Sequence, residues 1–228
     1  NFLELSPGET VTATVELEES GDTKFLVMVT RNGVIKKTPI GEFVNVRRSG
    51  LIAIGLKEGD SLDWVGPSTG SDEIVIATAN GQAIRFKEKN VRAMGRTASG
   101  VRAIRLKGKD VLVSMDIIDA ELAHKKMLEL FVITSEGLGK RTNLSEYRIQ
   151  GRGGSGVKTA AVTKKTGAVV GAHVVMKDSE EDILAISKAG QVIRFAYQSV
   201  RLAGRATQGV RCMRFKENGD QVISATLV

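Results

Sequence analysis

The feature that most constrains the fold is an internal repeat. Residues 83–106 (AIRFKEKNVRAMGRTASGVRAIRL) and residues 192–215 (VIRFAYQSVRLAGRATQGVRCMRF) are identical at 11 of 24 aligned positions. Two weaker copies begin at residues 31 and 135, and the turn glycines of the four copies are Gly33, Gly81, Gly137 and Gly190, spaced by 48, 56 and 53 residues. Similarity at such a period is typical of architectures that use one small unit many times. We therefore expect one supersecondary unit in four copies.

Each copy has the local signals of β-strands. It holds a short apolar run, KFLVMVT, EIVIATA, LELFVIT or DILAIS, which ends at a turn containing glycine. The Asn-Gly pairs in TRNGVIKK and TANGQAIRF favour two-residue hairpins, because both central residues of such a turn need positive φ. A third strand is expected after the second glycine (GVRAIRL, GVRCMRF) and a fourth before the next copy (VLVSMDI, AVVGAHVV, QVISATLV). The pattern predicts an all-β, propeller-like fold of four-stranded blades, with about four full repeats plus part of an earlier one.

The expected organisation is a single domain over residues 1–228. The repeats are predicted at residues 24–70, 72–118, 128–176 and 182–228. Residues 1–18 are interpreted as the remnant of a preceding blade, with Val11 to Glu18 as its last strand. One short surface helix is expected at Asp119 to Leu130. Because the chain begins with Asn1 rather than Met, we expect it to be a piece of something longer.

Positive charge is segregated within the repeat. The chain carries 33 Lys and Arg against 26 Asp and Glu, a formal net charge of +7, and acids gather in connections such as KDSEED and ELEESGD. The recurring bases are Lys37, Arg85, Arg141 and Arg194 after the turn glycines; Arg92, Arg148 and Arg201; Arg47, Arg48, Arg96, Arg152 and Arg205; and Arg102, Lys158 and Arg211 after the second glycines. Since a repeat returns equivalent residues to one radius and height of a disc, they predict a positive track for a polyanion around the rim. If about eight of them meet phosphates, the log–log salt slope of DNA binding is about −7.

The glycine-rich stretch RIQGRGGSGVK (residues 148–158) aligns with GRTASG and GRATQG in the neighbouring copies. It lacks the order of an NTPase phosphate loop, because Val157 separates Gly156 from Lys158, whereas such a loop has Lys directly after Gly. Strands expected on both sides argue against a linker. Glycine backbone can approach a phosphate closely and offer N–H groups to it, with Arg152 beside them.

This stretch resembles a motif of a known family. YRIQGRGGSGVK is similar to the basic box, of the form QRRGGKG after SEY, that marks the C-terminal DNA-wrapping domain of the bacterial DNA gyrase A subunit, and residues 78–106 are similar to a later blade of that domain. The resemblance covers nearly the whole chain. It implies a β-pinwheel whose rim bends double-stranded DNA around itself, so that a type IIA topoisomerase introduces negative supercoils. The implied partners are DNA, the gyrase B subunit, and the remainder of the gyrase A subunit.

The box is degenerate in this chain. Its positions are Gln150, Gly151, Arg152, Gly153, Gly154, Ser155 and Gly156. Gly151 and Ser155 stand where the complete box has basic residues. Such a box fits a late blade, so by this comparison the chain begins late in the second blade and continues through the last four.

The sequence gives little support for catalysis, and we expect no metal and no cofactor. His124 lies in the predicted helix and His173 in an apolar strand pattern, far apart in sequence. Tyr147 and Tyr197 each follow a hairpin strand and are expected to pack between blades. By the resemblance, the DNA-cleaving tyrosine and the ATPase belong to other regions of the enzyme, which makes this chain an accessory domain.

The remaining expectations concern location and alternative functions. The single Cys212 cannot form an internal disulfide, and no apolar run is long enough to span a membrane, so we expect a soluble bacterial protein of the cytoplasm, associated with the nucleoid. One alternative is the equivalent domain of topoisomerase IV, whose box is absent or degraded. A complete box in an upstream blade would argue for gyrase instead. Another is a propeller platform whose basic rim binds an acidic protein. An RNA-binding module is the least favoured, because the basic stretches lack stacking aromatics.

Overall fold

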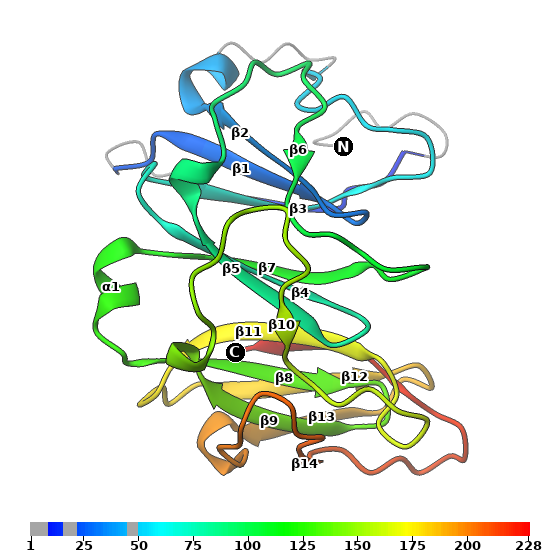
Figure 1. The fold of residues 1–228 in the computed structure, drawn as a ribbon. Coiled ribbons are helices and arrows are strands. Elements are labelled where there is room, and N and C mark those ends of the chain that lie inside the picture. The colour runs from blue at the N-terminus through cyan, green and yellow to red at the C-terminus, as the bar shows by residue number, and fades with distance from the viewer. Residues whose placement is uncertain (1–8, 16–21, 45–49) are drawn as a thin grey trace.

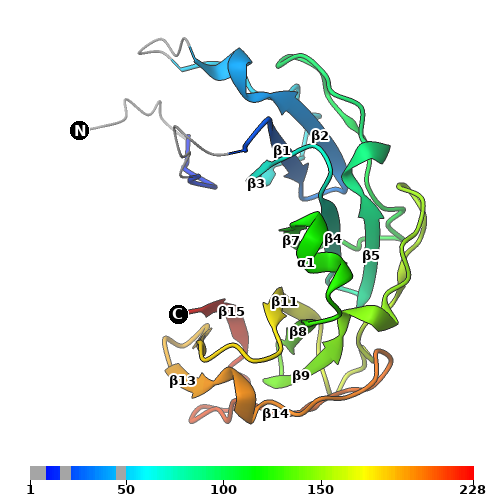
Figure 2. The ribbon, with the colours of Figure 1, turned by 90° about the vertical axis from the view of Figure 1, so that its left-hand side faces the viewer.

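The computed structural model describes residues 9–15, 22–44 and 50–228, and it is an all-β molecule of four small antiparallel sheets (Figure 1). The sheets follow one another along an arc (Figure 2). The edge strands labelled β3, β7, β11 and β15 lie on its concave side. The predicted propeller-like architecture of repeated sheets is thereby confirmed.

Within the described residues, three of the sheets have four strands and the last has three. In spatial order, the first sheet consists of β3 (Leu62–Ser68), β1 (Phe25–Thr30), β2 (Val34–Pro39) and β6 (Val101–Arg102). The second consists of β7 (Leu112–Ile118), β4 (Glu73–Thr78), β5 (Gln82–Lys87) and β10 (Val157–Lys158). The third consists of β11 (Val169–Met176), β8 (Leu128–Thr134), β9 (Leu138–Asn143) and β14 (Val210–Arg211). The fourth consists of β15 (Val222–Leu227), β12 (Asp182–Ser187) and β13 (Val192–Ala196).

A short 3-10 helix follows the second hairpin strand in every repeat. These helices are η1 (Ile40–Phe43), η2 (Glu88–Asn90), η3 (Leu144–Glu146) and η4 (Tyr197–Ser199). After η2, η3 and η4 the chain leaves its own sheet and runs over the convex side of the arc (Figure 2). We call residues 92–102, 148–158 and 201–211 the crossing segments.

The outermost strand of each four-stranded sheet comes from the following repeat. Strand β6 pairs with β2, β10 with β5, and β14 with β9, each through two residues. The sequence places GVRAIRL and GVRCMRF in longer strands of their own blades, and that expectation is wrong in length and in partner. Backbone bonds explain the exchange, because the arriving segments donate to the carbonyls of the turn glycines: Ala103 N–H to Gly33, Thr159 N–H to Gly81 and Cys212 N–H to Gly137, each at 2.8 Å.

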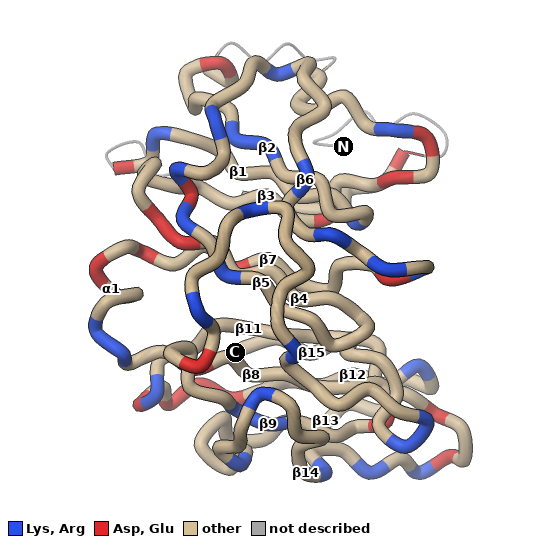
Figure 3. The backbone as a smooth tube through the Cα atoms, in the orientation of Figure 1, with Lys and Arg blue, Asp and Glu red and all other residues tan. Residues whose placement is uncertain are grey.

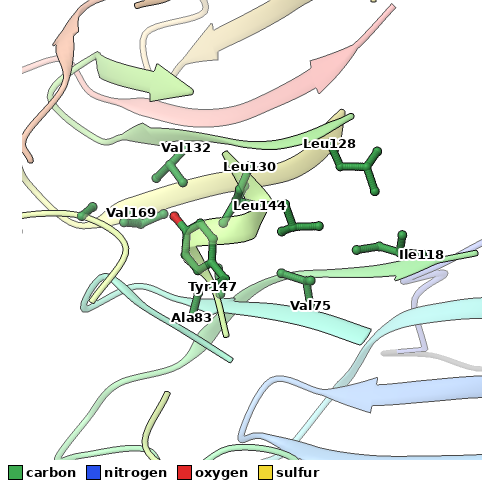
Figure 4. Close-up of a cluster of buried hydrophobic side chains, with 12 residues drawn as sticks. Val75, Ala83, Ile118, Leu128, Leu130, Val132, Leu144, Tyr147 and Val169 are labelled. Atoms are coloured by element: carbon green, nitrogen blue, oxygen red, sulfur yellow. The ribbon is translucent and has the colours of Figure 1, made fainter. Parts of the chain in front are cut away.

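Buried apolar clusters lie between consecutive sheets and join them. Between the second and third sheets, Val75 and Ala83 face Leu130 and Val132, with Tyr147 among them (Figure 4). The buried hydroxyl of Tyr147 lies 2.6 Å from the Thr159 hydroxyl, just beyond the end of a crossing segment. Burial of this kind makes each sheet depend on its neighbours.

Tyr197 has the same place between the third and fourth sheets. Its ring packs edge-on against Phe131, with 6.5 Å between ring centroids. Its hydroxyl donates to Glu129 at 2.9 Å. The expectation that both tyrosines pack between blades is confirmed.

The predicted helix Asp119–Leu130 is much shorter in the structure. Helix α1 covers Ala120–His124, with the Asp119 carboxylate capping the amides of Glu121 and Leu122. Lys126 then adopts φ +54°, and β8 begins at Leu128. The last residues of the predicted helix therefore belong to strand β8 of the third sheet.

The expected remnant strand at Val11–Glu18 is only partly described. Residues 9–15 form no strand, and residues 16–18 lie outside the described part of the chain. Among residues 9–15, 22–44 and 50–228, no helix has the length and apolar character needed to cross a bilayer.

The turn glycines allow a matched test of strand exchange. At Gly137 (φ +73°) an added Cβ would lie 2.6 Å from the Met213 carbonyl oxygen, whereas at Gly190 (φ +83°) nothing lies within 4 Å. We expect Gly137→Ala to lower the free energy of unfolding by about 3 kcal/mol and Gly190→Ala by about 1 kcal/mol, the cost of positive φ alone. Urea unfolding measures both, and equal losses would contradict the exchange.

Candidate nucleic-acid interface

The crossing segments carry exposed bases at matching positions. Arg92, Arg148 and Arg201 begin the three segments, and Arg102, Lys158 and Arg211 end them. In β6, β10 and β14 the valine is half-buried and the following base is exposed, because successive side chains of a strand point to opposite faces. The six bases therefore lie on the convex rim of the arc.

No described carboxylate forms an ion pair with these six side chains. Within the described residues, ion pairs occupy Arg31, Lys37, Arg85, Arg141 and Arg194, and none of the six exposed bases is among them. Figure 3 shows Lys and Arg along the crossing segments at the front, whereas Asp and Glu lie mostly toward the two margins of the view. The rim is thus a positive band bordered by negative groups.

A second set of predicted DNA-binding bases is buried. Lys37, Arg85 and Arg141 point into the fold, with side chains 7, 9 and 13% exposed. Arg85 Nε donates to Glu73 at 2.6 Å, and Arg141 Nη1 donates to Glu129 at 3.2 Å, across the same hairpin. We therefore do not include these three residues among the bases proposed to meet DNA, because their charges are already paired and shielded from solvent.

These buried bases bond the residues just before the crossing segments, and we call them the clamps. Arg85 Nη1 also donates to the carbonyls of Leu144 and Tyr147, and Arg141 Nε donates to the carbonyl of Val200 at 2.7 Å. Each arginine thus links its own hairpin to the point where the next repeat begins to cross.

Lys37 reaches the same result with different partners. The position that holds Glu73 and Glu129 in the next two copies holds Phe25 in the first, and Lys37 Nζ lies 4.7 Å from the centre of that ring. Its carboxylate partner is Glu88, at 3.0 Å, from the following repeat.

The fourth base of this set stands in the open. Arg194 pairs with Asp182 at 2.6 Å, but its side chain is 65% exposed. Its counterparts are covered by a crossing segment, and no described segment covers Arg194.

The bases in the middle of the crossing segments are half-buried and bonded to carbonyls. Arg152 donates to the carbonyls of Asn90 and Arg102, and Arg205 donates to that of Lys158 at 3.2 Å. Each joins its crossing segment to the preceding one, so these side chains position the rim and have fewer donors left for phosphate. Arg96 is also half-buried, whereas Arg47 and Arg48 lie outside the described residues.

The glycine-rich loop is tied to the neighbouring segment through its backbone. Gly153 N–H donates to the Ala103 carbonyl at 2.7 Å, and Arg105 N–H donates to the Gly154 carbonyl at 2.8 Å. Gly151 and Ser155 are exposed, and the side-chain nitrogen of Gln150 is buried without a partner. Part of the loop backbone is therefore bonded within the fold, and Gly151 and Ser155 are the positions that it exposes on the rim.

Two buried lysines hold the other crossing segments, and sequence reasoning missed them. Lys140 Nζ donates to the carbonyls of Gly204 and Arg205 and to the Thr207 hydroxyl. Burial lowers the pKa of Lys140 to about 8. Lys36 Nζ donates to the carbonyls of Ala53 and Arg96, and burial lowers its pKa too. Their signal was the basic pair Lys-Lys or Lys-Arg after the turn, whose first member faces the arriving loop.

In the described part of the chain, no group of three or more His, Cys, Asp and Glu side chains has the arrangement of a metal site. Of the two histidines, His173 Nε2 bonds the Ala225 carbonyl at 2.9 Å, and His124 ends the short helix α1.

Comparison with known sequences gives a consistent match. The family described as DNA gyrase C-terminal domain, beta-propeller, matches at residues 24–68, 72–119, 128–176 and 181–228. The DNA gyrase A subunit of Kosmotoga olearia is 42% identical over 230 residues, covering 100% of this chain and 28% of that protein. The DNA gyrase A subunit of Staphylococcus epidermidis is 38% identical over 215 residues, covering 94% of this chain and 23% of that protein. The chain thus spans about a quarter of the length of these relatives.

Solved structures with a similar fold come from two related enzymes. The C-terminal domain of DNA topoisomerase IV is similar with a TM-score of 0.82 and 27% identity, over 92% of this chain and 63% of that one. The DNA gyrase A C-terminal domain is similar with a TM-score of 0.76 and 25% identity, over 91% and 66% of the two chains.

The two environments of the clamp position give a matched stability test. We expect Arg85→Met to lower the free energy of unfolding by about 3–5 kcal/mol, since it leaves the Glu73 carboxylate buried without its cation. Arg194→Met removes an exposed pair and should cost about 1 kcal/mol or less. Chemical denaturation measures both, and a neutral Arg85→Met would show that the clamp does not support the fold.

Lys140 gives the fold a pH dependence of known sign. Its pKa falls from 10.5 in the unfolded chain to about 8 in the folded protein, so the folded state loses this proton first and Lys140 adds stability as pH rises above about 8. We expect the unfolding free energy of wild type to gain on that of Lys140→Met between about pH 7.5 and 9.5. Lys188→Met, at an exposed lysine, is the control and should run parallel to wild type. A parallel course for Lys140→Met would contradict the assigned pKa.

Proposed function

The chain belongs to the DNA gyrase C-terminal domain family, and we propose that it binds duplex DNA along its convex rim and bends it there. One observation carries the proposal. Arg92, Arg148 and Arg201, with Arg102, Lys158 and Arg211, are exposed and form no ion pair with any described carboxylate, at equivalent places in successive repeats. A duplex that follows the arc would meet two of them in each crossing segment.

The contacts are of the kind that phosphates make. Six neutralised phosphates correspond to a log–log salt slope of about −5, less steep than the sequence alone suggests because the buried clamps drop out. Binding should depend little on base sequence, since bases repeated once per blade reach the DNA backbone. Smooth bending of a site of about 20–30 bp costs about 1–6 kcal/mol, which several weak contacts spread along the path can offset.

The larger role follows from this activity. We propose that the chain is the accessory, non-catalytic part of a type IIA topoisomerase, whose partners at the nucleoid are the gyrase B subunit, together with the remainder of the gyrase A subunit. In that setting the bent DNA would direct negative supercoiling, and residues elsewhere in the longer protein would cleave DNA and hydrolyse ATP. The four repeats at 24–70, 72–118, 128–176 and 182–228 would be the structural units of the domain.

A role in topoisomerase IV is the second candidate, and the similarity to the C-terminal domain of that enzyme favours it. Ligation of nicked circles in the presence of the chain separates the possibilities. Wrapping as proposed for the gyrase role predicts a shift in linking number and tighter binding of longer fragments. The weaker wrap of the topoisomerase IV candidate predicts binding with little shift. A platform for an acidic protein predicts neither.

A triple substitution tests the site. We expect Arg92→Ala, Arg148→Ala and Arg201→Ala together to make the salt slope less steep by about 3 and to weaken duplex binding, because three phosphate contacts are lost. Thermal stability should change little, as all three side chains are exposed. Fluorescence anisotropy at several salt concentrations measures the slope.

The matched control removes three exposed lysines that lie outside the crossing segments, Lys164, Lys165 and Lys188. It has the same net charge as the test variant. An equal loss of slope in both variants would mean that net charge alone binds DNA, and it would overturn the site.

A further inference from the structure

Two exposed aliphatic side chains lie within the positive band of the rim. The second residue of each crossing segment, directly after the leading arginine, is Ala93, Ile149 or Leu202. Ile149 is 43% exposed and Leu202 is 47% exposed, and the buried apolar clusters described between the sheets include neither. A single exposed aliphatic residue is ordinary on a protein surface. Two at equivalent places, beside the exposed Arg148 and Arg201, lie where a bound duplex would cover them.

The backbone at this position is fixed by the receiving strand. Leu202 forms a parallel bridge with Arg141, whose N–H donates to the carbonyl before Leu202 at 3.0 Å and whose carbonyl accepts the N–H after it at 2.8 Å. Ile149 forms the same kind of bridge with Arg85. Because the strand already holds the backbone, covering either side chain with a ligand costs little further conformational freedom.

The short reach of these side chains limits the part of a duplex that they can touch. Base edges lie inside the grooves, where proteins read them with a helix or a β-ribbon that enters the groove. The crossing segments instead run over the convex side of the arc, bonded to the sheets, so each aliphatic group projects by one side chain only (Figure 2). Along each DNA strand a deoxyribose joins neighbouring phosphates. An aliphatic side chain next to an arginine that meets a phosphate therefore faces the sugar.

We propose that Ile149 and Leu202 pack against the deoxyribose backbone of duplex DNA and supply a part of the affinity that salt does not weaken. This inference rests on the proposed function of the rim. Contacts between bases and phosphates release counterions and set the slope of log affinity against log salt. Burial of apolar surface releases no counterions, so it contributes to the affinity extrapolated to about 1 M salt without changing the slope.

A double substitution tests the contact by introducing the residue that the first crossing segment has. We expect Ile149→Ala with Leu202→Ala to lower the extrapolated affinity about tenfold, which is about 1.4 kcal/mol. The reason is that nearly half of each side chain is still open to be covered. The slope should stay unchanged, since no charge is removed. Fluorescence anisotropy of a labelled duplex at several salt concentrations measures both quantities.

The converse substitution and a matched control use the same titration. Ala93→Ile gives the first crossing segment the aliphatic side chain that it lacks, and it should raise the extrapolated affinity about threefold at the same slope. Met127→Ala with Ile223→Ala removes two exposed apolar side chains outside the crossing segments, and it should change neither quantity. All five substituted side chains are exposed, so thermal unfolding should show that every variant folds.

A change in the DNA separates the sugar from the bases. Replacing every thymidine of the duplex by deoxyuridine removes the C5-methyl group, the apolar group that the major groove presents. The double variant should lose the same factor of affinity on both duplexes. A smaller loss on the deoxyuridine duplex would assign the contact to thymine methyls and overturn the assignment to the sugar.

The outcomes distinguish this inference from the proposed function. An unchanged extrapolated affinity in the double variant, an equal loss in the control, or no gain in Ala93→Ile would overturn the apolar contact and leave the basic rim in place. Absence of salt-dependent duplex binding by the wild type would overturn the proposed function, and the apolar contact with it.

Discussion

The fold depends on the exchange of a short strand between neighbouring repeats. A three-stranded sheet of this size buries little apolar surface by itself, so each repeat needs its neighbour. The exchanged ladder is only two residues long, and net contributions of about 0.5–1.5 kcal/mol per hydrogen bond are too small to fix its place alone. The turn glycines leave room for the incoming backbone, and the buried cationic clamps bond the next repeat to the hairpin. These two features fix the register of the exchanged strand.

This exchange also explains why the rim is made of connections rather than of sheet. A segment that leaves its own blade must run over the convex side, and its outward side chains become the surface of the arc. Alternation along β6, β10 and β14 turns the valine inward and exposes the base that follows. The same device that joins the repeats therefore presents the positive band.

The sequence was sufficient for the repeat, the hairpin strands of each copy, the fold class and the places of Tyr147 and Tyr197. It could not reveal that a segment pairs with the preceding sheet, because local patterns carry no information about partners distant in sequence. Recurrence of charge placed Lys37, Arg85 and Arg141 among the bases predicted to meet DNA, whereas the structure buries them in ion pairs. A base kept in every copy can serve the fold rather than a ligand. Period-2 patterning does not tell which face of a strand a neighbouring repeat covers. Lys36 and Lys140 were missed for the same reason, since loops from the next repeat bury them.

The clamps and the inter-segment arginines decide how stiff a path the rim can offer. Arg152 and Arg205 bond the backbone of the preceding crossing segment, so the spacing between exposed bases is set by hydrogen bonds between segments rather than by flexible side chains. A duplex bound at several such points has to adopt the curvature of the arc, because moving one contact would require moving a segment anchored in the next sheet. Isolated surface lysines at the same density would attract DNA equally well at long range but would follow the DNA instead of bending it. In the proposed function, attraction would thus come from the exposed bases, and curvature from the buried and half-buried ones.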